Sequence, residues 1–204
     1  MNMSEPKHTP HLRKQGSATQ LIVDGQPFLV LGGELHNSSA SNIEYMRPIW
    51  ERMVALNLNT VLAAVAWEQI ELVEGSFDFA LVDSLIQAAR GHDLRLILLW
   101  FGSWKNGMSS YVPAWVKRDY RRFPLAKLQS GQTAAVLSTC AQANWQADAR
   151  AFAALMQHIR AVDSAAQTVI MVQVENEVGL LGASRDHSEA VSYTHLTLPT
   201  ILRV

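Results

Sequence analysis

The residue types best suited to chemistry lie in one short segment, Gln173-Val174-Glu175-Asn176-Glu177-Val178-Gly179. The apolar run Thr168 to Val174 ends there in two carboxylates that flank an amide. Burying a carboxylate costs free energy unless it is paired, hydrogen-bonded or hydrated, so this placement needs a reason. Hydrolysis of a glycosidic bond supplies one, because it uses a carboxylic acid beside the leaving oxygen and a second carboxylate opposite it. Structural carboxylates with satisfied hydrogen bonds, or another chemistry, are the alternatives.

The segment follows the last of four apolar strands that alternate with amphipathic helices. The strands are predicted at 28–36, 59–67, 94–100 and 168–174. The helices are predicted after a capping box at Ser41 and Glu44, from Phe79 to Gly91, and from Trp145 to Ile159. This α/β order predicts a parallel sheet with right-handed crossovers, either open and doubly wound or closed into a barrel. No glycine-rich phosphate loop follows the first strand, which argues against nucleotide binding.

Three regions are expected along the chain. Residues 1–20 are polar and are predicted to be a flexible tail, and a hairpin around Asp24-Gly25 then leads into the first strand of a region that extends over 21–190. Residues 191–204 lack helical periodicity and resemble the translation of a transposase mosaic end with its sequencing adapter. We therefore expect 191–204 not to be native and the true sequence to continue differently after Ala190.

Composition narrows the function classes. The 204 residues are 49% hydrophobic and 17% charged, with 17 Lys and Arg against 18 Asp and Glu, so no net field attracts nucleic acid or an anionic membrane. A neutral, polar substrate fits better. The single Cys140, expected to be buried, permits no internal disulfide and no cysteine zinc site. No signal peptide or membrane span is visible, which predicts a cytoplasmic chain, with a periplasmic or secreted parent as the alternative.

Gln173 to Gly179 resembles the Gln-Val-Glu-Asn-Glu-Tyr-Gly pattern of glycoside hydrolase family 35, except that Val178 replaces the tyrosine. The chain is thus similar to the β-galactosidases of families 35 and 42, in a divergent bacterial branch. The resemblance implies the N-terminal half of a (β/α)8 TIM barrel, about four βα units. It assigns Glu177 as general acid/base and Asn176 as the amide at the sugar 2-hydroxyl. Glu175 carries no catalytic role; we expect it to contact the sugar or to support its neighbours.

Weaker matches extend the resemblance over about Leu21 to Gly179. Gly32 to His36 stands where family 35 has Gly-Ser-Ile-His, so His36 is a candidate sugar contact, with a structural hydrogen bond as the equal alternative. In the long connection 101–141, Trp104 is a candidate wall for the apolar face of a sugar, against a core role. Leu99 to Trp104 replaces the Ala-Glu-Trp of family 35, which removes one family sugar contact from the expected site.

The resemblance implies a retaining double displacement that requires no metal and no cofactor. The nucleophile would be a glutamate at the end of a seventh strand, and no residue of this chain takes that role. We therefore expect the polypeptide itself to be inactive, and its exposed strand edges to favour self-association. A non-catalytic carbohydrate-binding barrel, or a β-glycosidase acting on another sugar, are the alternatives.

Overall fold

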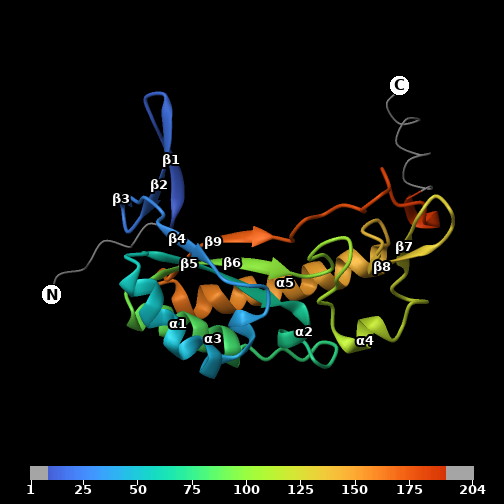
Figure 1. The fold of residues 1–204 in the computed structure, drawn as a ribbon, viewed down its shortest axis with the longest axis horizontal. Coiled ribbons are helices and arrows are strands. Elements are labelled where there is room, and N and C mark those ends of the chain that lie inside the picture. Colours follow the sequence, from blue (N-terminus) through green and yellow to red (C-terminus); the bar gives the residue numbers. More distant parts are fainter. Residues whose placement is uncertain (1–8, 192–204) are drawn as a thin grey trace. The chain divides into compact units, whose positions relative to one another are not determined.

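The sheet that carries the candidate segment has the strand order β4-β5-β6-β9 in a computed structural model that describes residues 9–191 (Figure 1). Its strands are β4 (Gly32–Glu34), β5 (Thr60–Ala66), β6 (Arg95–Phe101) and β9 (Val169–Val174). The described residues divide into two units. The sheet unit contains 9–65, Phe79–Leu99 and Leu155–Gln173, and the loop unit contains Ala66–Asp78, Trp100–Ala154 and 174–191.

The strand starts are aligned, as a parallel sheet requires. In β4 and β5, Gly32 lies opposite Thr60 in parallel register. At the next strand, Arg95 N–H donates to Asn59 O at 2.9 Å, and Leu96 N–H donates to Thr168 O at 2.7 Å. The predicted α/β class with a parallel sheet is therefore confirmed. The last three strands begin and end within one residue of their predicted positions, whereas β4 is shorter than the predicted arm 28–36.

Amphipathic helices connect these strands. They are α1 (Ile43–Ala55), α3 (Ala80–Gly91) and α5 (Gln142–Asp163). In α3, Val82, Leu85, Ile86 and Ala89 are buried at helical spacing, as predicted. The predicted cap of α1 was wrong by one residue: Asn42, not Ser41, is the N-cap, and its Oδ1 accepts Tyr45 N–H at 2.9 Å. Ser41 instead ends a short 3-10 turn, η1 (Ser39–Ser41).

The N-terminal residues are more ordered than their composition predicted. Strands β1 (His11–Gln15), β2 (Ala18–Val23) and β3 (Gln26–Pro27) form an antiparallel sheet, so a flexible tail reaching residue 20 was wrong. Gly16, at φ +61°, allows the tight turn between the first two strands. The predicted hairpin at Asp24-Gly25 is confirmed. Residues 1–8 lie outside the described part of the chain, as do 192–204, and with them most of the predicted non-native end.

Strand β9 differs from the prediction in its burial. It is an outer strand in the sheet order, with 43% of Met171 and 61% of Val174 exposed, whereas its largely apolar sequence predicted a buried strand. Its start is anchored by the buried Asp163 at the end of α5. Asp163 Oδ2 accepts Val169 N–H at 2.7 Å, and Oδ1 accepts Arg90 Nη2–H at 2.8 Å.

The loop unit consists of short elements between longer connections. They are α2 (Trp67–Ile70), α4 (Ala114–Lys117), and the antiparallel pair β7 (Leu125–Lys127) and β8 (Thr133–Leu137). The carboxylate of the fully buried Glu71 holds α2 in place, accepting Trp67 Nε1–H at 2.6 Å and Gly75 N–H at 2.7 Å. Cys140 is exposed, so its expected burial was wrong. Within the described residues, no helix is both long and apolar enough to span a bilayer.

The reassigned cap gives a test of the fold. Asn42→Ala removes the acceptor of Tyr45 N–H and should lower the free energy of unfolding by about 1 kcal/mol. Ser41→Ala removes only a hydroxyl that donates to Ser38 O and should cost clearly less. Urea unfolding followed by circular dichroism measures both. Equal losses, or a larger loss at Ser41, would restore Ser41 as the cap.

Candidate active site

Glu177, the predicted acid/base, lies in the loop unit just beyond the end of β9. Its side chain is 64% exposed, and its Oε2 lies 3.9 Å from Lys105 Nζ. The backbone of Glu177 has φ +43° and that of Glu175 has φ +60°, both in the left-handed region. Non-glycine residues there cost of order 1 kcal/mol or more and cluster at functional sites. The strand thus ends in two strained carboxylate residues on either side of Asn176.

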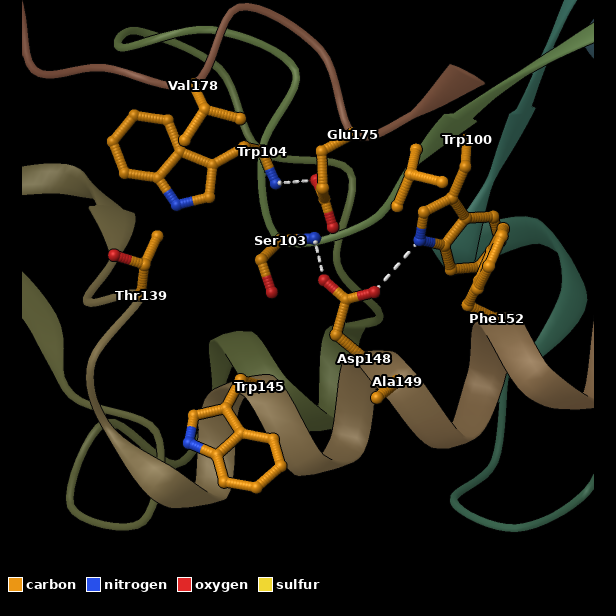
Figure 2. Close-up of a pocket in the computed structure, with 11 residues that line it drawn as sticks. Trp100, Ser103, Trp104, Thr139, Trp145, Asp148, Ala149, Phe152, Glu175 and Val178 are labelled. Atoms are coloured by element: carbon orange, nitrogen blue, oxygen red, sulfur yellow. Dashed lines mark hydrogen bonds between the residues drawn. The ribbon is translucent and has the colours of Figure 1, made fainter. Parts of the chain in front are cut away.

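Glu175 is paired with a second carboxyl group that belongs to α5, that of Asp148 (Figure 2). Asp148 is 7% exposed, and its oxygens accept two N–H groups, Trp100 Nε1 at 2.9 Å and Ser103 N at 2.6 Å. Glu175 Oε2 accepts Trp104 N–H at 2.8 Å. The carboxyl group of Asp148 is close enough to Glu175 to act on its pKa, and a hydrogen bond between the two acids requires one of them to be protonated.

The proton resides on Glu175 at neutral pH. Burial raises the pKa of Glu175 to about 9, with the hydrogen bond and the negative charge of Asp148 acting in the same direction. The backbone N–H groups of Trp104 and Ser103 oppose this shift in pKa without cancelling it. The two acids of the motif therefore have different environments: Glu175 is largely buried and neutral, whereas Glu177 faces water and a lysine.

The connection after β6 links these groups. Its residues Gly102 to Lys105 provide the Ser103 and Trp104 N–H groups just described, and the carbonyl of Lys105 accepts Asn176 Nδ2–H at 2.8 Å. Lys105 itself is 8% exposed, and its ammonium lies 5.6 Å from the centre of the Phe101 ring. Asn176 and Glu177 thus contact opposite ends of one lysine, its carbonyl and its ammonium.

A pocket of about 290 Å³ adjoins the carboxyl pair within the loop unit. Most of its lining is aromatic or aliphatic; the residues are Trp100, Ser103, Trp104, Thr139, Trp145, Asp148, Ala149, Phe152, Val174, Glu175 and Val178 (Figure 2). Ser103 Oγ and Trp104 Nε1 are buried there without a hydrogen-bond partner among residues 9–191. A ligand with an apolar face and hydroxyl groups would suit such a lining.

The structure brings four of the five predicted site residues into the loop unit: Trp104, Glu175, Asn176 and Glu177. Trp104 is 4% exposed and packs against Ala126 and Val136, although its ring also lines the pocket. His36 belongs to the sheet unit, where it is exposed and follows β4, and its carbonyl accepts Ser39 N–H. The roles predicted for these residues stay predictions.

Asp148 was missed by the sequence reasoning. The available signal was its position on α5: it lies three residues after Trp145 and four before Phe152, within the apolar stripe. A carboxylate on the buried face of a helix needs a partner, and here the partner is Glu175. Among the described residues, no three His, Cys, Asp or Glu side chains are grouped as a metal site would require.

The fold and the site together define an α/β protein with carboxyl groups at the C-terminal end of a parallel strand, where α/β enzymes place their active sites. Residues 20–197 match the model of glycosyl hydrolases family 35, and the chain belongs to this family. A relative is the β-galactosidase of Xanthomonas manihotis, 29% identical over 181 residues. That alignment covers 85% of this chain and 27% of the relative, so the chain spans about a quarter of the relative's length.

A solved structure with a similar fold is that of a catalytic mutant of a GH42 β-galactosidase from G. stearothermophilus. The TM-score is 0.63 at 16% sequence identity, over 84% of this chain and 24% of the other. At this identity the likeness concerns the fold.

The pKa of Glu175 predicts how stability depends on pH. Its pKa of about 9 in the folded state lies above the unfolded value, so its contribution is full at acidic pH and is lost as the pH rises toward 9. Glu175→Gln is neutral at every pH and keeps one donor and one acceptor. The stability of the variant relative to the native chain should therefore increase between about pH 5 and 9. Thermal unfolding of both chains measures this difference; a difference independent of pH contradicts a protonated Glu175.

Proposed function

We propose that this chain supplies the acid/base half of the active site of a retaining β-galactosidase, with Glu177 as general acid and then general base. The observation that carries the proposal is the Asn176-Glu177 pair at the end of β9 in a chain whose residues 20–197 match family 35. The four-stranded parallel sheet would be the first half of a (β/α)8 barrel. The outer position and the exposed apolar side chains of β9 are what a further strand would cover.

In the proposed reaction, a carboxylate nucleophile attacks the anomeric carbon while Glu177 donates its proton to the leaving glycosidic oxygen. Glu177 then removes a proton from water, which attacks the galactosyl ester and releases galactose with retained configuration. Asn176 is proposed to bond the sugar 2-hydroxyl, a contact that strengthens in the oxocarbenium-like transition state. Trp104 and Ser103 line the pocket beside the carboxyl pair, where a sugar is proposed to bind.

The nucleophile is proposed to lie in a part of the enzyme that this chain does not include. Two further carboxyl groups of the loop unit are already engaged: Asp148 accepts N–H groups from Trp100 and Ser103, and Glu175 accepts that of Trp104. The nucleophile of a retaining mechanism is instead an ionised carboxylate about 5 Å from the acid/base. The match to about a quarter of a β-galactosidase leaves ample chain for the missing residue.

Leaving-group dependence tests the role of Glu177 in the full-length enzyme that contains this chain. Glu177→Gln should lower kcat for lactose by roughly 10²- to 10⁴-fold, because the leaving sugar needs a proton. Formation of the galactosyl enzyme from 2,4-dinitrophenyl β-galactoside should be much less affected, because that leaving group needs none. Added azide should then restore turnover of the dinitrophenyl substrate and yield β-galactosyl azide.

Glu189→Gln, the same change at an exposed carboxylate, is the matched control and should leave all three rates unaltered. Equal losses of kcat on both substrates, without azide rescue, would remove Glu177 from the acid/base role. Turnover of an aryl β-glucoside but not of the galactoside would show that the enzyme is specific for glucose rather than galactose. Galactose binding without any turnover would favour the non-catalytic carbohydrate-binding alternative.

The 204-residue chain by itself should not hydrolyse aryl β-galactosides, because it presents one of the two carboxylates that the mechanism requires. The measurement is release of 4-nitrophenol at high protein concentration, with the Glu177→Gln chain as the background control. Turnover that disappears in this variant would show that the chain holds a nucleophile of its own.

A further inference from the structure

We propose that Asp148 and Glu175 share one proton and act as a positioning pair, which fixes Gly102 to Lys105 beside Asn176 and Glu177. The inference rests on the proposed function, because it concerns the groups that keep Lys105 and Asn176 beside the proposed acid/base, Glu177. Neither carboxyl group is assigned a contact with the sugar.

The contacts of the pair connect three segments of the loop unit. Asp148 comes from α5 and accepts the Trp100 indole N–H and the Ser103 backbone N–H. Glu175 comes from the end of β9 and accepts the backbone N–H of Trp104. Three donors from the end of β6 and its loop therefore converge on two carboxyl groups from the elements on either side.

The proton is what makes this arrangement stable. Two ionised carboxylates in contact would repel each other, whereas O–H donation from one to the other gives a short, charge-assisted hydrogen bond. Asp148 accepts two N–H groups and is 7% exposed, so the negative charge is best accommodated there and Glu175 is the donor. Two further charged groups of the loop unit, the Lys105 ammonium and the Glu177 carboxylate, lie 3.9 Å from each other.

Gly102 permits the loop to approach the pair this closely. A Cβ at residue 102 would lie 2.5 Å from Asp148 Oδ1 and 2.5 Å from Glu175 Oε1. Any side chain there would have to separate the two carboxyl groups or displace the loop. The predicted loss of the family's Ala-Glu-Trp in this stretch thus coincides with a segment, Gly102 to Lys105, that packs its backbone against the pair.

The segment Gly102 to Lys105 connects the carboxyl pair to Asn176 and Glu177. Lys105 O accepts the amide of Asn176 at 2.8 Å, and Lys105 Nζ lies beside Glu177. A displacement of Ser103 and Trp104 therefore moves both the amide proposed to bind the 2-hydroxyl and the cation next to the acid/base. Asp148 and Glu175 act through Lys105 and Asn176, so they are positioning residues.

Three substitutions distinguish a pair that shares a proton from two side chains that are merely packed together. Glu175→Gln keeps an acceptor for Trp104 N–H and an N–H donor for Asp148. Asp148→Asn has one acceptor oxygen for two N–H donors and so loses a hydrogen bond. Gly102→Ala introduces the clashing Cβ. Gly91→Ala, a helical glycine whose added Cβ meets nothing within 4 Å, is the control.

Hydrogen exchange of the Ser103 and Trp104 amides in the 204-residue chain is the first measurement. Protection should persist in Glu175→Gln and Gly91→Ala. It should fall at least about tenfold in Asp148→Asn and Gly102→Ala, as expected for the loss of a hydrogen bond to a charged group. The carbon-13 shift of the Glu175 carboxyl carbon should titrate near pH 9 in the native chain. If Asp148→Asn does not fold, Glu175→Ala replaces it. Amide protection should be lower in Glu175→Ala, which lacks the acceptor for Trp104 N–H, than in Glu175→Gln, which keeps it.

In the full-length enzyme, Asp148→Asn should lower kcat for lactose more than Glu175→Gln does, and more than it lowers the rate with the dinitrophenyl substrate. Native-like amide protection in Asp148→Asn, an equal loss of protection in Glu175→Gln, or titration of Glu175 in the ordinary range of a glutamate would overturn the pair. If the amides behave as expected while the enzyme shows no glycoside hydrolysis, the pair stands and the proposed function fails.

Discussion

Two carboxyl groups in contact inside a protein repel each other unless a proton or a cation compensates their charge, and the site depends on this constraint at Asp148 and Glu175. Because the pair carries one negative charge, it can accept N–H groups from Trp100, Ser103 and Trp104 without a buried cation. Its oxygens satisfy backbone groups of a loop that contains no regular structure between Ser103 and Lys105. An aliphatic pair of the same size would leave those donors buried and unbonded, at a cost of about 1–3 kcal/mol each.

The local backbone explains how neighbouring acids acquire different roles. In an extended strand, residues 175 and 177 would point to the same face, since side chains alternate with a period of two. Left-handed φ angles at both residues break that alternation. Glu175 lies beside Asp148 of α5, where its raised pKa keeps it neutral, whereas the side chain of Glu177 remains 64% exposed beside Lys105. Backbone strain, normally a cost, is thus what allows one short motif to present a structural carboxyl group and an accessible one.

The sequence predicted the periodic parts of the fold well and the irregular parts poorly. Strands β5 and β9 and helix α3 were placed within about one residue, because apolar periodicity reports directly on burial. The strand pair at His11–Gln15 was missed, since its stability comes from pairing with β2 rather than from its own apolar residues. Likewise, the motif identified Glu177 but not Asp148. A contact between residues 148 and 175 depends on tertiary packing within the loop unit, which no local pattern encodes.

The exposure of Glu177 bears on how its proposed role would be completed. A general acid works in surroundings that hold its proton until the leaving oxygen is in place, usually through exclusion of water. With most of its side chain in solvent, Glu177 does not obtain that exclusion from the described residues. Under the proposed function, bound sugar and further parts of the enzyme would have to provide it. The buried pair has the opposite property: its hydrogen bonds are complete within the loop unit, so it can hold Lys105 and Asn176 in position before substrate arrives.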